Sequence, residues 1–104
     1  MSLKEQLTED MKTAMKAKEA GKQRLAVIRM VRSAIRQQEI DGTKKSLDDE
    51  DVITIIGKEV KMRKDSLEEF KKGGREDLVA QTQAEIEILM PYLPQQLSEG
   101  EIRV

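Results

Sequence analysis

Apolar residues recur at three- and four-residue intervals along most of the chain, and this spacing places them on one face of successive helices. The first such pattern begins at Leu3, where Ser2 and Glu5 have the S-x-x-E arrangement of a helix N-terminal capping box. A broader apolar face runs from about residue 22 to residue 39, which suits a helix in the middle of a bundle. The pattern therefore predicts two helices, separated near Gly21.

The second half of the chain continues the helical spacing. An Asp-Gly pair at residues 41–42 predicts a turn. Ser46 is expected to begin the third and longest helix, whose acidic first turns complement the helix dipole. Gly57 lies inside this helix and is expected to permit the close approach of another helix. A Gly-Gly pair at residues 73–74 predicts its end, and a fourth helix is expected over about residues 75–90.

The residues after the fourth helix indicate a corner and the start of another module. The MPYLP run at residues 90–94 predicts an extended corner, because proline cannot continue a helix. Ser98 and Glu101 form a second S-x-x-E pattern, which predicts a further helix. We therefore expect an all-α protein, with a four-helix N-terminal bundle over residues 1–94 and the start of a small tail domain over residues 95–104.

Composition excludes several classes of chemistry. The 104 residues contain no cysteine and no histidine, which excludes a disulfide framework, a cysteine zinc site and a Ser-His-Asp triad. P-loop and G-x-S-x-G motifs are also missing from the sequence. We expect no independent catalysis, no metal site and no cofactor. No apolar run approaches the roughly 20 residues of a membrane helix. The first residues lack the apolar core of a signal peptide, so a cytoplasmic location without membrane contact is expected.

The net charge of −1 hides an asymmetry, because the first part of the chain is basic and the second part acidic. Arg29, Arg32 and Arg36 follow one face of the second predicted helix at positions i, i+3 and i+7. Such a row suits the phosphate oxygens of a nucleic-acid backbone. The alternative is a solvated helix face that pairs with the acidic third and fourth helices. With two aromatic residues in the chain, any RNA contact is expected to involve backbone and shape rather than base stacking.

Arg63 and Lys64 belong to a second basic cluster, in the third predicted helix. Arg63 falls on the apolar stripe of that helix, where a charge must be paired or must reach the surface. One hypothesis pairs Arg63 with a carboxylate of a neighbouring helix, such as Glu39 or Glu85. The other hypothesis has Arg63 face a partner or a ligand.

Three stretches of the sequence resemble one known family. These are LKEQLTEDMKTAMKAKE (3–19), LAVIRMVRSAIRQQEID (25–41) and a long run over residues 59–102 that includes RKDSLEEFKKGGREDL and YLPQQLSEGEI. They resemble the YqeY-like proteins, small bacterial relatives of the C-terminal part of GatB, a subunit of the glutamine-dependent aminoacyl-tRNA amidotransferase. The resemblance implies a helical bundle followed by a small three-helix tail, which in GatB belongs to the tRNA-binding part of the complex.

Two functional hypotheses follow, and both leave the oligomeric state open. The resemblance favours a non-catalytic accessory module that contacts tRNA or a tRNA-handling enzyme. It also associates the family with carbon–nitrogen ligase activity that uses glutamine as amide donor, although that chemistry belongs to other parts of the amidotransferase complex. The alternative is a protein–protein interaction bundle with no direct RNA contact. The residues predicted to contact RNA are Arg29, Arg32, Arg36, Arg63 and Lys64.

Overall fold

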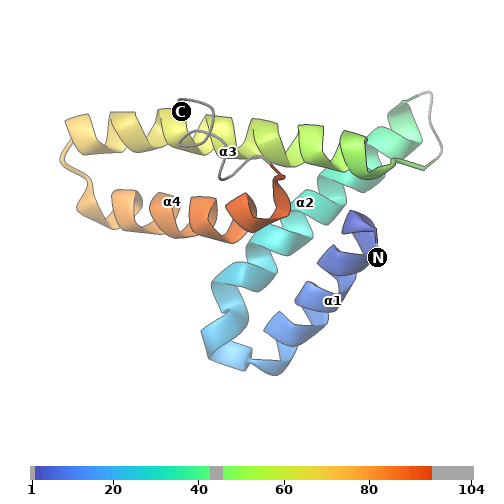
Figure 1. The fold of residues 1–104 in the computed structure, drawn as a ribbon. Coiled ribbons are helices and arrows are strands. Elements are labelled where there is room, and N and C mark those ends of the chain that lie inside the picture. The colour runs from blue at the N-terminus through green and yellow to red at the C-terminus, as the bar shows by residue number, and fades with distance from the viewer. Residues whose placement is uncertain (1, 43–45, 95–104) are drawn as a thin grey trace, which may run out of the picture. The chain divides into compact units, whose positions relative to one another are not determined.

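The computed structural model describes residues 2–42 and 46–94, and within these ranges the chain is helical and has no strand (Figure 1). This part of the chain forms the α-helices α1 (Leu3–Lys16), α2 (Lys22–Asp41), α3 (Asp49–Lys72) and α4 (Glu76–Leu89), with short 3₁₀ segments η1 (Lys18–Gly21) and η2 (Met90–Tyr92). The predicted all-α class is confirmed. None of the described helices is both long and apolar enough to cross a membrane.

Contacts within the chain divide it into two compact units, Met1–Ile55 and Ile56–Val104. The predicted tail, residues 95–104, lies outside the described residues, and so does the predicted cap formed by Ser98 and Glu101. The predicted division into residues 1–94 and 95–104 therefore stays a prediction.

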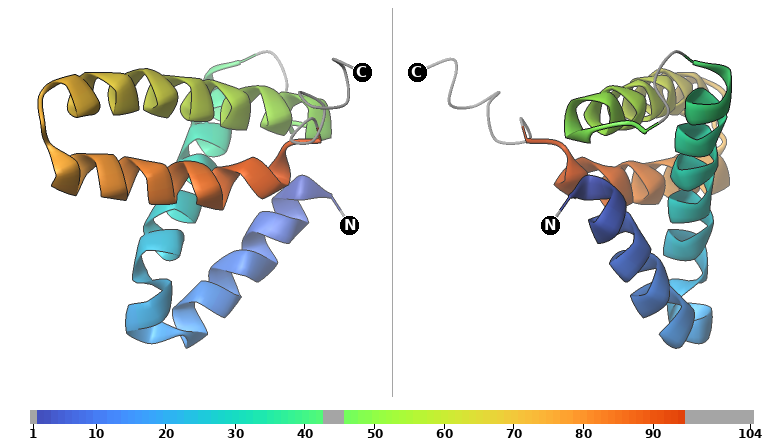
Figure 2. Two further views of the ribbon diagram at one scale, coloured as in Figure 1. Left: turned by 60° about the vertical axis from the view of Figure 1, so that its left-hand side comes forward. Right: turned by 90° about the vertical axis from the view of Figure 1, so that its right-hand side faces the viewer.

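In the first unit, α1 and α2 form a helical hairpin that is closed by η1 (Figures 1 and 2). The predicted capping box of α1 is confirmed: Glu5 N donates to Ser2 Oγ at 3.2 Å, and Ser2 N donates to Glu5 Oε1 at 2.9 Å. At the closed end of the hairpin, the buried Gly21 lies directly against the backbone of Ala14 in α1. The buried apolar side chains of this unit are Leu7, Ala14, Val27, Ile28, Val31, Ile35, Leu47, Val52 and Ile55.

The third helix begins at Asp49, so the predicted start at Ser46 is wrong. Asp48 and Asp51 cap this helix reciprocally, because Asp51 N donates to Asp48 Oδ1 at 3.0 Å and Asp48 N donates to Asp51 Oδ2 at 3.2 Å. Ser46 instead accepts a hydrogen bond from Lys4 Nζ at 3.2 Å. Aspartate is as good a cap as serine, and the acidic run offered several candidates.

Glu39 joins the C-terminal end of α2 to α1 and to the segment that precedes α3. Its Oε2 accepts hydrogen bonds from Lys4 Nζ at 2.5 Å and from Leu47 N at 2.9 Å. The Lys4 hydrogen bond, and after it the Leu47 amide, lowers the pKa of Glu39 below its usual range. Close by in the sequence, Leu3 N donates to Asp49 Oδ1 at 2.9 Å. The first turn of α1 is thus fastened to residues far along the chain.

Replacing Glu39 with glutamine is expected to reduce the stability of the protein at neutral pH. It is also expected to make that stability less dependent on pH. The folded pKa of Glu39 is lowered, so its ionised form stabilises the protein above the unfolded pKa of about 4.3. That contribution is lost as the pH falls through the lower folded pKa. Thermal unfolding gives the melting temperature of each protein from neutral pH to about pH 3. The melting temperatures of wild type and Glu39→Gln should differ at neutral pH and converge in acid. The exposed Glu68→Gln is the matched control, and a gap that stays constant with pH would contradict the assignment.

In the second unit, α4 folds back along α3 after a turn at the Gly-Gly pair (Figures 1 and 2). The predicted end of the third helix is confirmed, because Arg75 N donates to Phe70 O at 3.0 Å and Gly74 N donates to Lys71 O at 3.2 Å. Gly74 has φ +69°, the left-handed conformation that this Schellman motif requires. The buried side chains of this unit are Ile56, Val60, Leu67, Thr82, Ile86, Leu89 and Tyr92.

Two local expectations about this unit are wrong. Met90–Tyr92 forms a 3₁₀ turn rather than an extended corner, because Pro91 lies in its first turn, where a missing backbone N–H costs nothing; the extended backbone begins at Leu93. Gly57 does not permit a close helix approach, since no atom of its own unit lies within 4 Å of the position that a Cβ would occupy.

Candidate functional site

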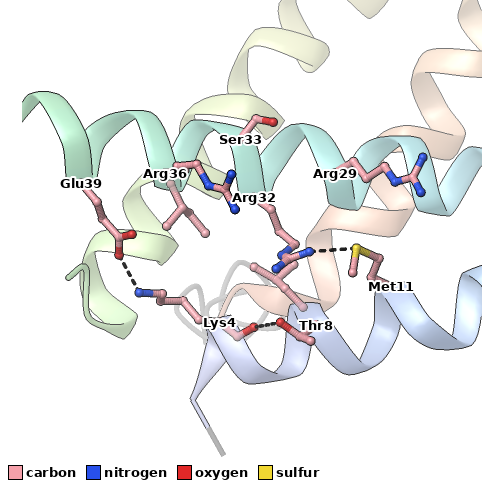
Figure 3. Close-up of a pocket in the computed structure, with 10 residues that line it drawn as sticks. Lys4, Thr8, Met11, Arg29, Arg32, Ser33, Arg36 and Glu39 are labelled. Carbon is pink, nitrogen blue, oxygen red and sulfur yellow. Dashed lines mark hydrogen bonds and ion pairs between the residues drawn. The ribbon is translucent and has the colours of Figure 1, made fainter. Parts of the chain in front are cut away.

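A pocket of about 380 Å³ lies between α1 and α2 in the first unit (Figure 3). From α1 it is lined by Lys4, Leu7, Thr8 and Met11, and from α2 by Arg29, Arg32, Ser33, Ile35, Arg36 and Glu39. Both sets follow the three- and four-residue spacing of a single helix face. The volume lies within the roughly 300–1,000 Å³ of small-ligand pockets.

The pocket combines an apolar base with a polar rim. Leu7 from α1 and Ile35 from α2 are 0% and 4% exposed, so their side chains are fixed by packing. Met11 is half-buried beside them and adds a flexible, polarisable thioether. The hydroxyl of Thr8 donates to its own helix, at Lys4 O, over 3.0 Å. A ligand in the pocket can therefore contact the Met11 side chain, whereas Leu7 and Ile35 are already covered by the protein, and charged groups surround the site.

The charges around the pocket are strongly positive. Four cationic side chains line it, with Glu39 as the single carboxylate. Glu39 is already engaged by Lys4, so the excess charge comes from Arg29, Arg32 and Arg36. In the described part of the first unit, none of these three arginines forms an ion pair. The predicted row of arginines on one face of α2 is thus confirmed, and it borders a pocket.

Arg32 is the arginine that reaches across to α1. Figure 3 shows its side chain pointing from α2 toward Met11, whose Sδ accepts a hydrogen bond from Arg32 Nη1 at 2.9 Å. Its side chain is half-buried, whereas Arg29 and Arg36 are exposed. Because the thioether is uncharged, this contact holds the guanidinium in place without neutralising it.

The other two predicted site residues, Arg63 and Lys64, lie on α3 in the second unit. Arg63 Nε donates to Glu85 Oε1 at 3.0 Å, and Arg63 Nη1 donates to Glu59 Oε1 at 2.6 Å. The Arg63 side chain is 16% exposed. The structure therefore confirms the expected pairing with Glu85, whereas the Glu39 carboxylate pairs with Lys4 instead. Lys64 is exposed.

The sequence interpretation missed the half of the pocket that comes from α1. Lys4, Thr8 and Met11 follow each other at i, i+4 and i+7, so their common face was visible in the sequence. What the sequence did not show is that this face meets the arginines of α2. In the residues that the structure describes, no group of three or more acidic side chains is placed to hold a metal ion.

The fold and the pocket define a small all-α protein with a basic cavity between its first two helices. A family model described as "Yqey-like protein" matches residues 4–104. The chain therefore belongs to the YqeY-like family, as its resemblance predicted.

Several curated relatives of this chain share one name, "Altered inheritance of mitochondria protein 41, mitochondrial". The relative from Lachancea thermotolerans is 43% identical over 98 residues, which cover 92% of this chain and 51% of the relative. The relative from Kluyveromyces lactis is 43% identical over 86 residues, and that from Saccharomyces cerevisiae strain S288c is 40% identical over 86 residues. The chain spans about half the length of these relatives.

These names correct the expected cytoplasmic location, because the relatives are named as mitochondrial proteins. The expectation depended on the lack of an apolar signal-peptide core. That lack bears only on secretion, since mitochondrial transit peptides are amphipathic, rich in arginine and serine, and have no such core.

Proposed function

We propose that this protein is a non-catalytic accessory module that contacts tRNA or a tRNA-handling enzyme through the arginine face of α2, defined as Arg29, Arg32 and Arg36. The observation that carries the proposal is that these three arginines line one pocket and that Glu39, the one carboxylate among its described lining residues, is engaged by Lys4. The sequence resemblance to the C-terminal part of GatB favours tRNA as the nucleic acid. On this proposal, any amide-transfer chemistry belongs to other proteins of the assembly.

The spacing of the arginine face suits a phosphate backbone. Arg29 and Arg36 are separated by about 10 Å along the helix axis, at roughly 1.5 Å per residue. Each guanidinium presents a planar fork of donors that matches phosphate oxygens. A row of such groups neutralises phosphates and releases counterions, so the contact is sensitive to salt and tolerant of base sequence.

The predicted contacts on α3 contribute differently. The guanidinium of Arg63 is occupied by Glu59 and Glu85, so we assign it to the packing of α3 and α4 rather than to RNA. Lys64 is exposed and stays a predicted contact.

Neutralising the arginine face is expected to abolish most of the salt dependence of tRNA binding. In the triple variant Arg29→Gln, Arg32→Gln, Arg36→Gln, the slope of log affinity against log salt should fall by about 3, because each lost phosphate contact lowers it by about 1. Fluorescence anisotropy with bulk tRNA at several salt concentrations measures this slope. The matched control is Lys61→Gln, Lys71→Gln, Lys72→Gln, which removes the same charge from exposed positions of α3.

Identical slopes for wild type and the arginine triple variant would contradict the proposal. A control variant that loses as much slope as the arginine variant would also contradict it, because binding would then follow net charge rather than this face.

The alternative, a protein-interaction module without RNA contact, is favoured by exposed apolar side chains in the first unit. Ile40 is 70% exposed and Met15 is 49% exposed. Affinity purification before and after nuclease treatment separates the two functions. Partners that persist after nuclease and are lost in Ile40→Asp, while tRNA binding is undetectable, would favour the alternative.

A further inference from the structure

The pocket differs from a flat basic surface, because its three arginines border one small cavity with an apolar base. We propose that this cavity binds a terminal phosphate, the phosphomonoester group of a nucleotide or of an RNA end, with the attached nucleoside against Thr8 and Met11. The inference rests on the proposed function, since it names the part of the nucleic acid that enters the site.

Charge favours a terminal phosphate over an internal one. A phosphomonoester carries about −1.5 to −2 at pH 7, whereas a phosphodiester carries a single negative charge. Lys4 and Glu39 neutralise each other, which leaves three guanidinium groups around the cavity. A doubly charged ligand gains more Coulomb energy from three guanidinium groups around one cavity than a singly charged ligand does. The guanidinium forks also match the oxygens of a terminal phosphate.

Size and lining favour one nucleotide rather than a length of duplex. The volume of about 380 Å³ lies near the lower end of the range for small-ligand pockets. The half-buried side chains of Thr8 and Met11 line the pocket and offer a surface to a sugar or a base. Arg32 is held by Met11 Sδ, and a guanidinium plane is a surface on which an unstacked base packs. The cavity thus offers both parts of a nucleotide a matching surface.

A matched pair of ligands tests the proposal on the wild-type protein. Isothermal titration or anisotropy compares a short single-stranded oligoadenylate carrying a 5′-phosphate with the same strand carrying a 5′-hydroxyl. We expect the 5′-phosphate to bind about tenfold more tightly, a difference of roughly 1.4 kcal/mol. Adenosine 5′-monophosphate, adenosine and inorganic phosphate complete the set, and the monophosphate is expected to bind more tightly than either of the other two. If the monophosphate binds but the two oligonucleotide ends bind equally well, the ligand of the cavity is a free nucleotide rather than an RNA end.

The preference for the 5′-phosphate should weaken in mild acid. The second pKa of a phosphomonoester is about 6, so the ligand loses one charge between neutral pH and about pH 5. Glu39, the carboxylate among the described residues that line the cavity, keeps its charge over this interval, because its hydrogen bond from Lys4 lowers its pKa. A preference that does not change with pH would contradict recognition of the second charge.

Two threonines of α1 provide a matched pair of protein variants. The hydroxyls of both donate to the carbonyl of the residue four positions earlier, at 3.0 Å for Thr8 and 3.1 Å for Thr13, but only Thr8 lines the pocket. Thr8→Trp should fill the cavity without removing any cation and should lower the affinity for adenosine monophosphate about tenfold or more. Thr13→Trp should leave that affinity unchanged. Thermal unfolding of both variants reports whether the fold is intact, and the ligand comparison on wild type needs neither variant.

The outcomes separate this inference from the proposed function. Equal affinity for the two ends, or an intact Thr8→Trp that binds both ligands like wild type, would overturn the terminal-phosphate site. The proposed contact of tRNA with the arginine face would remain supported if the salt dependence of tRNA binding had fallen in the triple variant. If the end preference is present and tRNA binding is independent of the arginines, the proposed function fails and the cavity remains a nucleotide site.

Discussion

Replacing Gly21 with alanine is expected to destabilise the first unit by about 3 kcal/mol or more, as for severe overpacking of a core. A Cβ at this position would stand 2.2 Å from the carbonyl oxygen of Ala14 and 2.8 Å from its carbonyl carbon. Both are backbone atoms, so no side-chain rotation relieves the contact, and α1 must move away from the turn. The backbone of Gly21, at φ −100° and ψ 2°, is accessible to any residue, so the cost comes from the contact.

Gly57→Ala is the control for this substitution, because it adds the same methyl group in open space. It should raise stability by about 1 kcal/mol, the difference in helix propensity between glycine and alanine. Urea unfolding followed by circular dichroism measures both variants. Equal effects of the two substitutions would show that close approach at Gly21 does not hold α1 against α2.

Replacing Arg63 with methionine is expected to destabilise the second unit by about 2–3 kcal/mol, because Glu59 and Glu85 would lose their shared counter-ion in a partly buried position. This expected loss is smaller than the full cost of breaking a buried ion pair. The Arg63 side chain is 16% exposed, so water screens the remaining charges. Its neighbour Lys64 is exposed, and Lys64→Met should leave the unfolding free energy almost unchanged.

A rescue variant distinguishes the ion pairs from simple packing. In Arg63→Met combined with Glu59→Gln and Glu85→Gln, no charge is left unpaired, so part of the lost stability should return. Chemical unfolding gives the free energies, and tRNA anisotropy on the same proteins gives the affinities. A loss of tRNA affinity in Arg63→Met, with the stability unchanged, would return this residue to the RNA interface.

Helix spans were predictable because each depends on a local pattern, whereas helix contacts were not. The capping box at Ser2 and the Gly-Gly end of α3 follow from neighbouring residues alone. A close approach depends on which faces meet: the sequence interpretation placed one at Gly57, whereas the structure has it at Gly21. Met15 continues the apolar spacing of α1 yet is 49% exposed, whereas the adjacent Ala14 is buried.

The candidate site was predictable to the same extent. The row formed by Arg29, Arg32 and Arg36 follows from helical spacing within α2. The pocket needs α1 as well, and the contact that brings Met11 to Arg32 depends on the hairpin geometry at Gly21. Arg63 stood out as a charge on an apolar stripe, but only the fold could choose Glu85 over Glu39 as its partner.

The fastening of α1 to distant residues has a consequence for the order in which the protein folds during synthesis. Lys4 bonds to Glu39, 35 residues later, and Leu3 bonds to Asp49, 46 residues later. A helix as short as α1 is marginal in isolation. At roughly 5–20 residues per second, several seconds separate the emergence of α1 from that of its last partner. The contacts of the first unit are therefore completed only after the start of α3 has left the ribosome.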